Sequence, residues 1–161
     1  MKKEYGNIFK LARQEAGITQ EVACGLLLIK DRTTLSRYEN NQVIPNDELV
    51  YEMMKVYRAK WLGYEYFRLY TKIGQAILPP IFRRKVGHLT LMFKKERDDL
   101  IDIERDLVRM TYDDVITEDE EEEWKSSTKE IQDVVAAGMS LLLVDIEKEL
   151  SQCGNIERAY V

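Results

Sequence analysis

The sequence ITQEVACGLLLIKDRTTLSRYENNQVIPN, residues Ile18–Asn46, decides the fold because it contains two short helical patterns separated by a turn. The second pattern covers Asp31–Asn40 and begins with Asp31, a typical N-cap residue. Leu35 and Tyr38 lie three residues apart and therefore share the inner face. Four polar side chains remain on the outer face: Arg32, Thr33, Ser36 and Arg37. Their donors and acceptors suit base edges and phosphates.

The first pattern is predicted to begin at Thr19, which is also a good N-cap residue. Gln20 follows and adds a side-chain donor close to the N-terminus of that helix. Backbone N–H groups at a helix N-terminus already favour a bound phosphate. The start of this helix is therefore a predicted phosphate contact.

Separated pieces of the first third of the chain follow one another in a recognisable order and spacing: Ala12-Arg13, Ala16–Gln20, Thr34–Asn41 and Ile44-Pro45. Together they resemble the Xre/Cro/cI-type helix-turn-helix family, small five-helix domains of phage and bacterial regulators. The resemblance covers roughly residues 5–60. It implies a lambda-repressor-like domain in which Asp31–Asn40 is the recognition helix.

The resemblance also implies roles for single residues. Contacts to DNA bases fall on the outer face of the recognition helix: Arg32, Thr33, Ser36 and Arg37. Contacts to DNA phosphates fall at the helix ends: Thr19, Gln20, and the backbone near Asn40 and Asn41. The resemblance pairs Arg13 with Glu39, and such an ion pair fixes the first helix against the third more reliably than it adds stability.

The turn departs from the family pattern, which usually has a small residue in the first helix of the motif and a glycine in the turn. Here Gln20 and Leu35 are one residue further apart than is common. Either Ala23 or Cys24 takes the small position, and residues 27–30 replace the glycine turn. A longer turn changes how the recognition helix is aimed.

Composition bounds the rest of the protein. The chain has 161 residues, 45% of them hydrophobic and 33% charged, with only three prolines, which is typical of a helix-rich chain of one ordinary domain or two small ones. No stretch approaches the roughly 20 apolar residues of a membrane span, and the first ten residues lack the apolar core of a signal peptide. We therefore expect a cytoplasmic protein that does not bind membranes.

The negative charge is unevenly distributed. Residues 1–75 carry 12 lysines and arginines against 9 acidic residues, whereas residues 76–161 carry 12 against 20. The net charge of −5 therefore combines a mildly basic N-terminal half with a strongly acidic C-terminal half. The basic half can still approach DNA phosphates, and the acidic half limits non-specific binding.

The residues that most enzymes and metal sites require are scarce. Cys24 and Cys153 are far apart in sequence, His88 is the only histidine, and no glycine-rich phosphate loop is present. Both cysteines are expected to be buried small residues. Acidic residues such as Asp98, Asp99 and Asp102 lie among basic ones, where solvated ion pairs are the default. We expect no catalysis, no metal and no cofactor.

Three further helical stretches complete the N-terminal half. Residues 7–16 form a first helix that ends at Gly17, and Pro45-Asn46-Asp47 begins a fourth, with these residues facing inward: Ile8, Leu11, Ala12, Leu49, Val50, Met53, Met54 and Tyr57. The aromatic stretch of residues 61–77 is either a stacking platform for single-stranded nucleic acid or, as we favour, a packing seam formed by Trp61, Tyr64, Phe67 and Leu69 or Tyr70. Pro79-Pro80 marks a boundary between domains 1–78 and 79–161.

The second domain is predicted to be a long helical hairpin. Its first helix has a heptad seam broken by one charge: Phe82, Val86, Leu89, Phe93, Glu96, Leu100, Ile103, Leu107 and Met110. Thr117 and Glu120 form a capping-box pattern before an acidic helix start. The second helix continues with this seam: Trp124, Thr128, Ile131, Val135, Gly138, Leu142, Ile146 and Leu150.

Residues 139–144 are apolar nearly all round, so one antiparallel helix cannot cover them. Either a second chain or the aromatic stretch 61–77 must bury them. For a dimer, the predicted contacts are Phe93, Leu100, Ile103, Leu107, Met139, Leu142, Leu143 and Ile146. The sequence thus favours an all-α, homodimeric regulator that binds a palindromic operator in double-stranded DNA, a repressor by the resemblance, with a possible protein effector. The alternative is an antitoxin or adaptor that binds a partner protein through the C-terminal helices.

Overall fold

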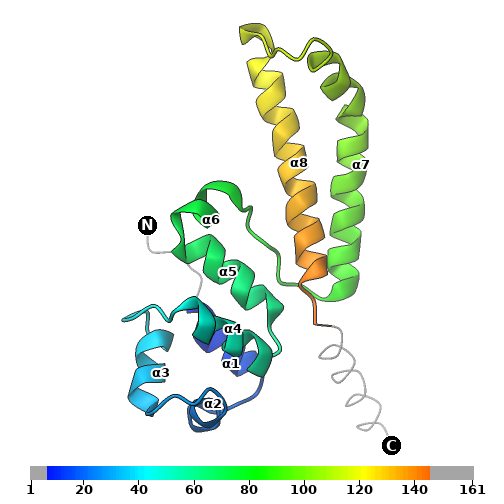
Figure 1. The fold of residues 1–161 in the computed structure, drawn as a ribbon. Coiled ribbons are helices and arrows are strands. Elements are labelled where there is room, and N and C mark those ends of the chain that lie inside the picture. Colours follow the sequence, from blue (N-terminus) through cyan, green and yellow to red (C-terminus); the bar gives the residue numbers. More distant parts are fainter. Residues whose placement is uncertain (1–6, 146–161) are drawn as a thin grey trace, which may run out of the picture. The chain divides into compact units, whose positions relative to one another are not determined.

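The computed structural model describes residues 7–145, which form helices and turns without a β-strand (Figure 1). The elements are α1 Ile8–Glu15, α2 Gln20–Leu26, α3 Arg32–Glu39, α4 Asp47–Val56, α5 Lys60–Tyr70, α6 Lys72–Ile77, α7 Val86–Met110, the 3₁₀ turn η1 Glu118–Glu120, and α8 Glu121–Leu142. The all-α prediction is confirmed. Within the described range, no helix is both long enough and apolar enough to cross a membrane.

The chain divides into two compact units. Among the described residues, one unit contains 7–76 together with 143–145, and the other is Ile77–Leu142. The first unit holds the five-helix domain, and the second holds the helical hairpin. The predicted division into domains 1–78 and 79–161 stays a prediction.

Polar side chains cap the first four helices and explain where they begin. The oxygens of Asn7, Thr19, Asp31 and Asn46 accept hydrogen bonds from backbone N–H groups three residues further on. The predicted caps at Thr19 and Asp31 and the predicted start of the fourth helix are confirmed. Gly17 lies just after the C-terminus of α1 and has a φ of 71°, a left-handed conformation that glycine adopts at little cost.

The core of the first unit lies between α1, α3, α4 and α5. Its largest fully buried side chains are Phe9, Leu35, Met53, Tyr57 and Leu62. The predicted inward positions Ile8, Ala12 and Val50 are buried as well. Each helix thus turns one apolar face to a shared centre, which holds α3 in a fixed position on the surface.

The aromatic helix α5 packs on the core with most of the predicted seam, because Trp61, Leu69 and Tyr70 are partly buried against it. Leu62 and Glu65 are its buried residues, and the rings of Tyr66 and Tyr70 lie 6.4 and 5.8 Å from the ring of Phe9. Phe67, predicted to lie in the seam, is 43% exposed. The prediction missed Phe9, whose ring fixes which of the many aromatics of α5 turn inward.

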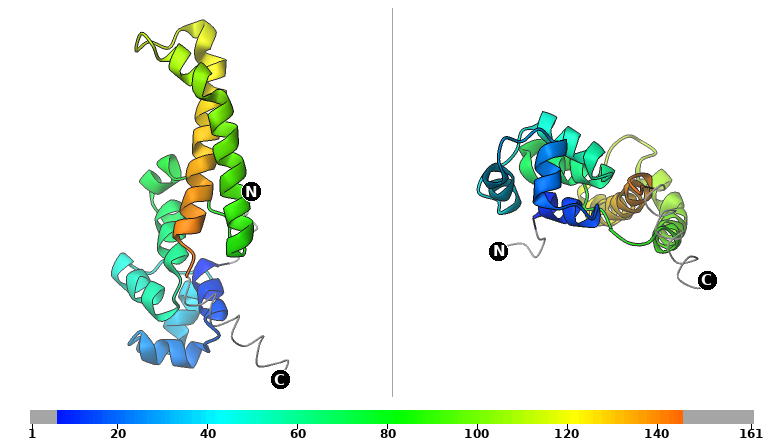
Figure 2. Two further views of the ribbon diagram at one scale, coloured as in Figure 1. Left: turned by 90° about the vertical axis from the view of Figure 1, so that its right-hand side faces the viewer. Right: turned by 90° about the horizontal axis from the view of Figure 1, so that it is seen from below.

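The second unit is an antiparallel hairpin in which α7 and α8 lie side by side, as the two views of Figure 2 also show. The seam of α7 follows the prediction over most of its length, because Leu89 and Met110 are buried and Phe93, Leu100 and Ile103 are partly buried. Phe82 and Val86, predicted to open that seam, are exposed. The Thr117–Glu120 capping box is present: Glu120 accepts from the Thr117 backbone N–H at 3.1 Å.

The predicted seam of α8 is only partly correct, because Trp124, Thr128 and Gly138 are partly buried but three other positions are exposed. Its buried residues are small ones, Ser127, Ala136, Ala137 and Ser140, whereas Ile131, Val135 and Leu142 are 38%, 46% and 73% exposed. Small residues let the two backbones approach closely, and Phe93 then fits against Gly138. The buried Ser140 hydroxyl accepts a hydrogen bond from the Phe82 backbone N–H at 2.8 Å.

Several other predictions concern the ends and single residues. α8 ends at Leu142 instead of continuing through residue 150, and the predicted positions Ile146, Leu150 and Cys153 lie outside the described residues. Cys24 is partly buried and packs at the edge of the first unit's core. His88 is exposed on α7.

Candidate nucleic-acid interface

The helix α3 is anchored by its inner face and leaves its outer face to solvent. Leu35 and Glu39 are buried, whereas Arg32, Thr33 and Arg37 are exposed. Asp31 accepts from the Thr34 backbone N–H at 2.8 Å, and this hydrogen bond lowers the pKa of the Asp31 carboxyl. The cap therefore stays ionised at neutral pH, where its charge complements the helix dipole.

Ser36 is less available than its neighbours on that face. It is partly buried, and its hydroxyl accepts from the side-chain amide of Asn40 at 3.2 Å. The same amide donates to the Ser36 carbonyl at 2.8 Å. Two residues predicted to contact DNA separately, Ser36 at a base and Asn40 at a phosphate, are thus bonded to each other.

A buried ion pair fixes α3 against α1. Arg13 donates to the Glu39 carboxylate through Nε at 2.6 Å and through a terminal nitrogen at 2.9 Å, and the pair is largely buried. This hydrogen bonding raises the pKa of the Arg13 guanidinium. Arg13 also donates to the Ile18 carbonyl at 2.7 Å, so one side chain joins α1, the turn after it and α3. The bidentate geometry sets the angle at which α3 is presented.

Gln20 connects this buried pair to the exposed surface. Its amide nitrogen donates to the Glu39 carboxylate at 2.8 Å, and its amide oxygen accepts from the Nε of Arg32 at 2.8 Å. Both polar atoms of the Gln20 side chain are therefore occupied within the domain. Among the described residues, the terminal nitrogens of Arg32 have no hydrogen-bond partner, and Arg32 is the first residue of α3. Gln20 stays a predicted phosphate contact, and within the domain its side chain also holds the Nε of Arg32.

The turn between α2 and α3 has an unusual residue. Leu28 has a φ of 53° and is 91% exposed, so it occupies the left-handed position that a glycine would normally take. Ala23 is completely buried and takes the small position in α2. The Ile29 backbone N–H donates to the Cys24 carbonyl at 3.0 Å, which closes the turn and brings the chain to Asp31.

The end of α3 is tied down by residues distant in sequence. Asn41 has a φ of 56°, and its side-chain oxygen accepts from the amide of Asn7 at 2.6 Å and from the hydroxyl of Tyr70 at 3.1 Å. The Asn7 amide also donates to the Tyr38 carbonyl at 2.6 Å. The Asn41 side chain thus connects the residues that flank or end α1, α3 and α5, and the phosphate contact of the backbone near Asn41 stays a prediction. Apart from the position of Asn7 as a helix cap, no local pattern indicated this role.

The described residues contain one group that could hold a metal ion. Carboxylate oxygens of Glu96, Glu130 and Asp133 lie within 4.8 Å of one another on α7 and α8, and all three residues are partly exposed. Glu96 also pairs with Lys95 at 3.4 Å. Exposed carboxylates at such spacing are common without a bound ion, and this group belongs to the hairpin unit.

Comparison with known families agrees with this architecture. The family model described as helix-turn-helix matches residues 9–61, which span α1 to the start of α5. This part of the chain is a helix-turn-helix domain of the Xre/cI type, a domain of DNA-binding transcription regulators. Neither the curated proteins nor the solved structures contained a match to the chain.

Proposed function

We propose that the protein is a sequence-specific regulator that binds double-stranded DNA, inserts α3 into the major groove and acts as a repressor. The main support is the oriented guanidinium of Arg32, which Gln20 holds at 2.8 Å at the start of α3. An arginine with both terminal nitrogens available can donate two parallel hydrogen bonds to a guanine. Thr33 and Arg37 are exposed on the same short helix and extend the contact along the groove.

Preorganisation is what makes this arrangement suited to reading sequence. A free arginine side chain loses rotamer entropy when it binds, and ordering it in advance reduces that cost. The chain of hydrogen bonds from Arg13 through Glu39 and Gln20 begins in the buried interior, so the position of Arg32 depends on the fold itself. Phosphate contacts then come from backbone groups near Thr19 and Asn40, because the neighbouring side chains are bonded internally.

We further propose that the regulator is a homodimer held by its hairpin. A single helix-turn-helix head covers few base pairs, and a two-fold axis doubles the contacts on a palindromic operator with half-sites roughly 34 Å apart. The exposed apolar residues of α8, namely Ile131, Val135 and Leu142, fall on one face and offer a surface for a second copy. The other predicted dimer contacts in the described part of the chain are partly buried, namely Phe93, Leu100, Ile103, Leu107, Met139 and Leu143.

The same apolar face supports the second candidate function, an antitoxin or adaptor. A partner protein could cover Ile131, Val135 and Leu142 as well as a second copy could. Sedimentation at micromolar concentration separates the two. A dimer supports the homodimeric regulator, and a monomer that co-purifies with a stoichiometric partner supports the adaptor.

Selection of bound sequences from random duplex DNA tests the function most broadly. The proposal predicts a palindromic consensus, because two copies of α3 read equivalent half-sites. A pool without enrichment would show that the head domain does not read sequence. A DNA-binding regulator of the phage or bacterial type acts in the cytoplasm, so this test can be repeated there by mapping bound genomic sites.

A further inference from the structure

The segment that precedes α7 carries unusual charge. Residues 78–85 join α6 to α7 without helix, and the segment ends in three consecutive cations, Arg83, Arg84 and Lys85. The unit Ile77–Leu142 otherwise is acidic, with 16 acidic residues against 10 lysines and arginines in all. A concentrated positive charge in an acidic unit indicates a binding partner of opposite sign.

The other cations of the hairpin are mostly paired with carboxylates. Lys94 and Lys95 contact Asp98 and Asp99 at 2.5 and 2.6 Å, four residues further along α7. Farther along, Arg109 contacts Glu123 at 2.5 Å, and Lys125 contacts Glu121 at 2.8 Å. Arg84 and Lys85 differ because both are exposed and neither has an ion pair among the described residues.

Their position also opposes the local electrostatics of the helix. Lys85 is the N-cap of α7, makes no side-chain cap hydrogen bond, and no acidic residue follows in the first turn. Positive charge is disfavoured at a helix N-terminus by the helix dipole. A charged residue that destabilises its own helix, and has no contact that compensates, is expected to contribute to binding.

We infer that Arg84 and Lys85 form a second phosphate-binding surface, which contacts the DNA backbone beside the bases that α3 reads. This inference rests on the proposed function, because that function supplies the DNA. The tether makes the contact feasible: eight residues, 78–85, separate α6 from α7 and reach at most about 28 Å. Once the head is bound, the phosphates that flank its site are present near the segment at high effective concentration.

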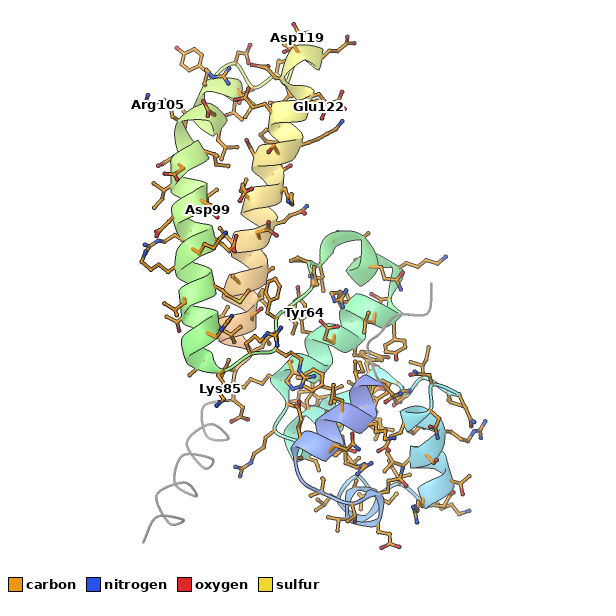
Figure 3. All side chains as sticks on the ribbon, turned by 180° about the vertical axis from the view of Figure 1, so that it is seen from behind. Tyr64, Lys85, Asp99, Arg105, Asp119 and Glu122 are labelled. Atoms are coloured by element: carbon orange, nitrogen blue, oxygen red, sulfur yellow. The ribbon has the colours of Figure 1, made fainter. Side chains whose placement is uncertain are left out.

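The main competing partner is an acidic protein surface, such as the tip of a second hairpin. Figure 3 shows Lys85 at one end of the hairpin and Asp119 and Glu122 at the other. Part of that acidic tip is already neutralised, since Arg109 pairs with Glu123 and Lys125 pairs with Glu121. The DNA backbone has one charge per roughly 1.7 Å of helix axis and no internal cation, so it is the stronger partner.

The test is the salt dependence of DNA binding by the full chain. The double variant Arg84→Ala/Lys85→Ala is titrated against the selected duplex and against a scrambled duplex of the same length, from about 50 to 200 mM salt. Each lost phosphate contact reduces the slope of log affinity against log salt by about 0.9, so we expect a reduction close to two. The loss of affinity across this salt range should then be about tenfold smaller than for the wild type, for both duplexes alike.

The matched control is Lys94→Ala/Lys125→Ala, which removes the same charge from two cations that are already paired. Its salt slope should equal that of the wild type. Thermal unfolding should show that Arg84→Ala/Lys85→Ala is at least as stable as the wild type, because it removes cations from a helix N-terminus.

The remaining outcomes overturn the inference in distinguishable ways. An unchanged slope with intact DNA binding shows that the segment does not contact DNA, and the proposed function stands. If the double variant sediments as a monomer where the wild type is a dimer, the segment binds the acidic tip of a second copy. A wild-type protein that binds neither duplex refutes the proposed function, and this inference with it.

Discussion

The Nε of Arg32 donates a hydrogen bond of 2.8 Å to the side-chain oxygen of Gln20, across the turn that separates α2 from α3. Gln20 is in turn bonded to the buried carboxylate of Glu39, which also receives Arg13. The orientation of an exposed arginine thus depends on a buried ion pair in the centre of the domain. This dependence gives the surface of α3 a defined geometry before any ligand arrives.

Replacing Gln20 should impair discrimination between DNA sequences. Gln20→Ala releases the Nε of Arg32 and leaves one oxygen of Glu39 with fewer donors. We expect the preference for the selected duplex over a scrambled one to fall by about 1–3 kcal/mol, as when a base contact is lost. Competition titration measures this preference. Gln14→Ala, which changes an exposed glutamine on α1, serves as the control and should leave it intact.

Breaking the ion pair of Arg13 and Glu39 should destabilise the domain strongly. The Glu39 side chain is only 2% exposed, so Arg13→Met leaves a buried carboxylate without its main partner and should cost about 3–5 kcal/mol in the free energy of unfolding. The double variant Arg13→Met/Glu39→Met should cost less than the sum of the two single variants. Chemical denaturation gives all three values, and strictly additive values would mean that the two residues do not interact. The exposed pair of Lys94 and Asp98 gives the comparison, since Lys94→Ala should change stability by less than about 0.5 kcal/mol.

Relieving the left-handed turn should stabilise the domain. Leu28 has a φ of 53° and buries almost none of its surface, so Leu28→Gly removes backbone strain without loss of packing. The greater entropy of glycine in the unfolded chain offsets part of this gain. We therefore expect the free energy of unfolding to rise by up to about 1 kcal/mol. Leu26→Gly, two residues earlier in α2, should instead lower it by about 1 kcal/mol. Equal effects of the two substitutions would contradict the assigned turn geometry.

A methyl group at Gly74 should not be tolerated without rearrangement. A Cβ atom there would lie 2.1 Å from the backbone oxygen of Phe67, and backbone atoms cannot move aside as a flexible side chain can. Gly74→Ala should therefore lower the melting temperature, with a cost of about 1–3 kcal/mol. Gly87→Ala provides the contrast in α7, where nothing lies within 4 Å of the added atom. That variant should be neutral or more stable by up to about 1 kcal/mol. A stable Gly74→Ala would show that α6 packs on α5 differently.

The elements that could be predicted from the sequence are those that depend on residues close to one another in the chain. Caps at Thr19 and Asp31 and the capping box at Thr117 depend on residues three positions apart, and the structure confirms them. The motif around residues 12–45 was recognisable for the same reason, because its pieces have a fixed spacing, and the family model matches there.

The features that the sequence did not reveal depend on contacts between distant segments. Nothing near Gln20 in sequence shows that Glu39 and Arg32 will meet its two polar atoms. In α8 the apolar pattern of Ile131 and Val135 was interpreted as a seam, but α7 packs on the small residues next to them. Hydrophobic periodicity finds a face of a helix, and the close approach of a second backbone can favour another face.

The central claim is that the outer face of α3 reads duplex DNA, and one competition titration tests it most directly. The protein and the double variant Arg32→Ala/Arg37→Ala are each titrated with a duplex obtained by selection and with a scrambled duplex of equal length. The account predicts that the double variant remains folded and loses at least about 1–3 kcal/mol of the wild type's preference for the selected duplex. If the folded variant kept that preference in full, α3 would not be the element that reads the sequence.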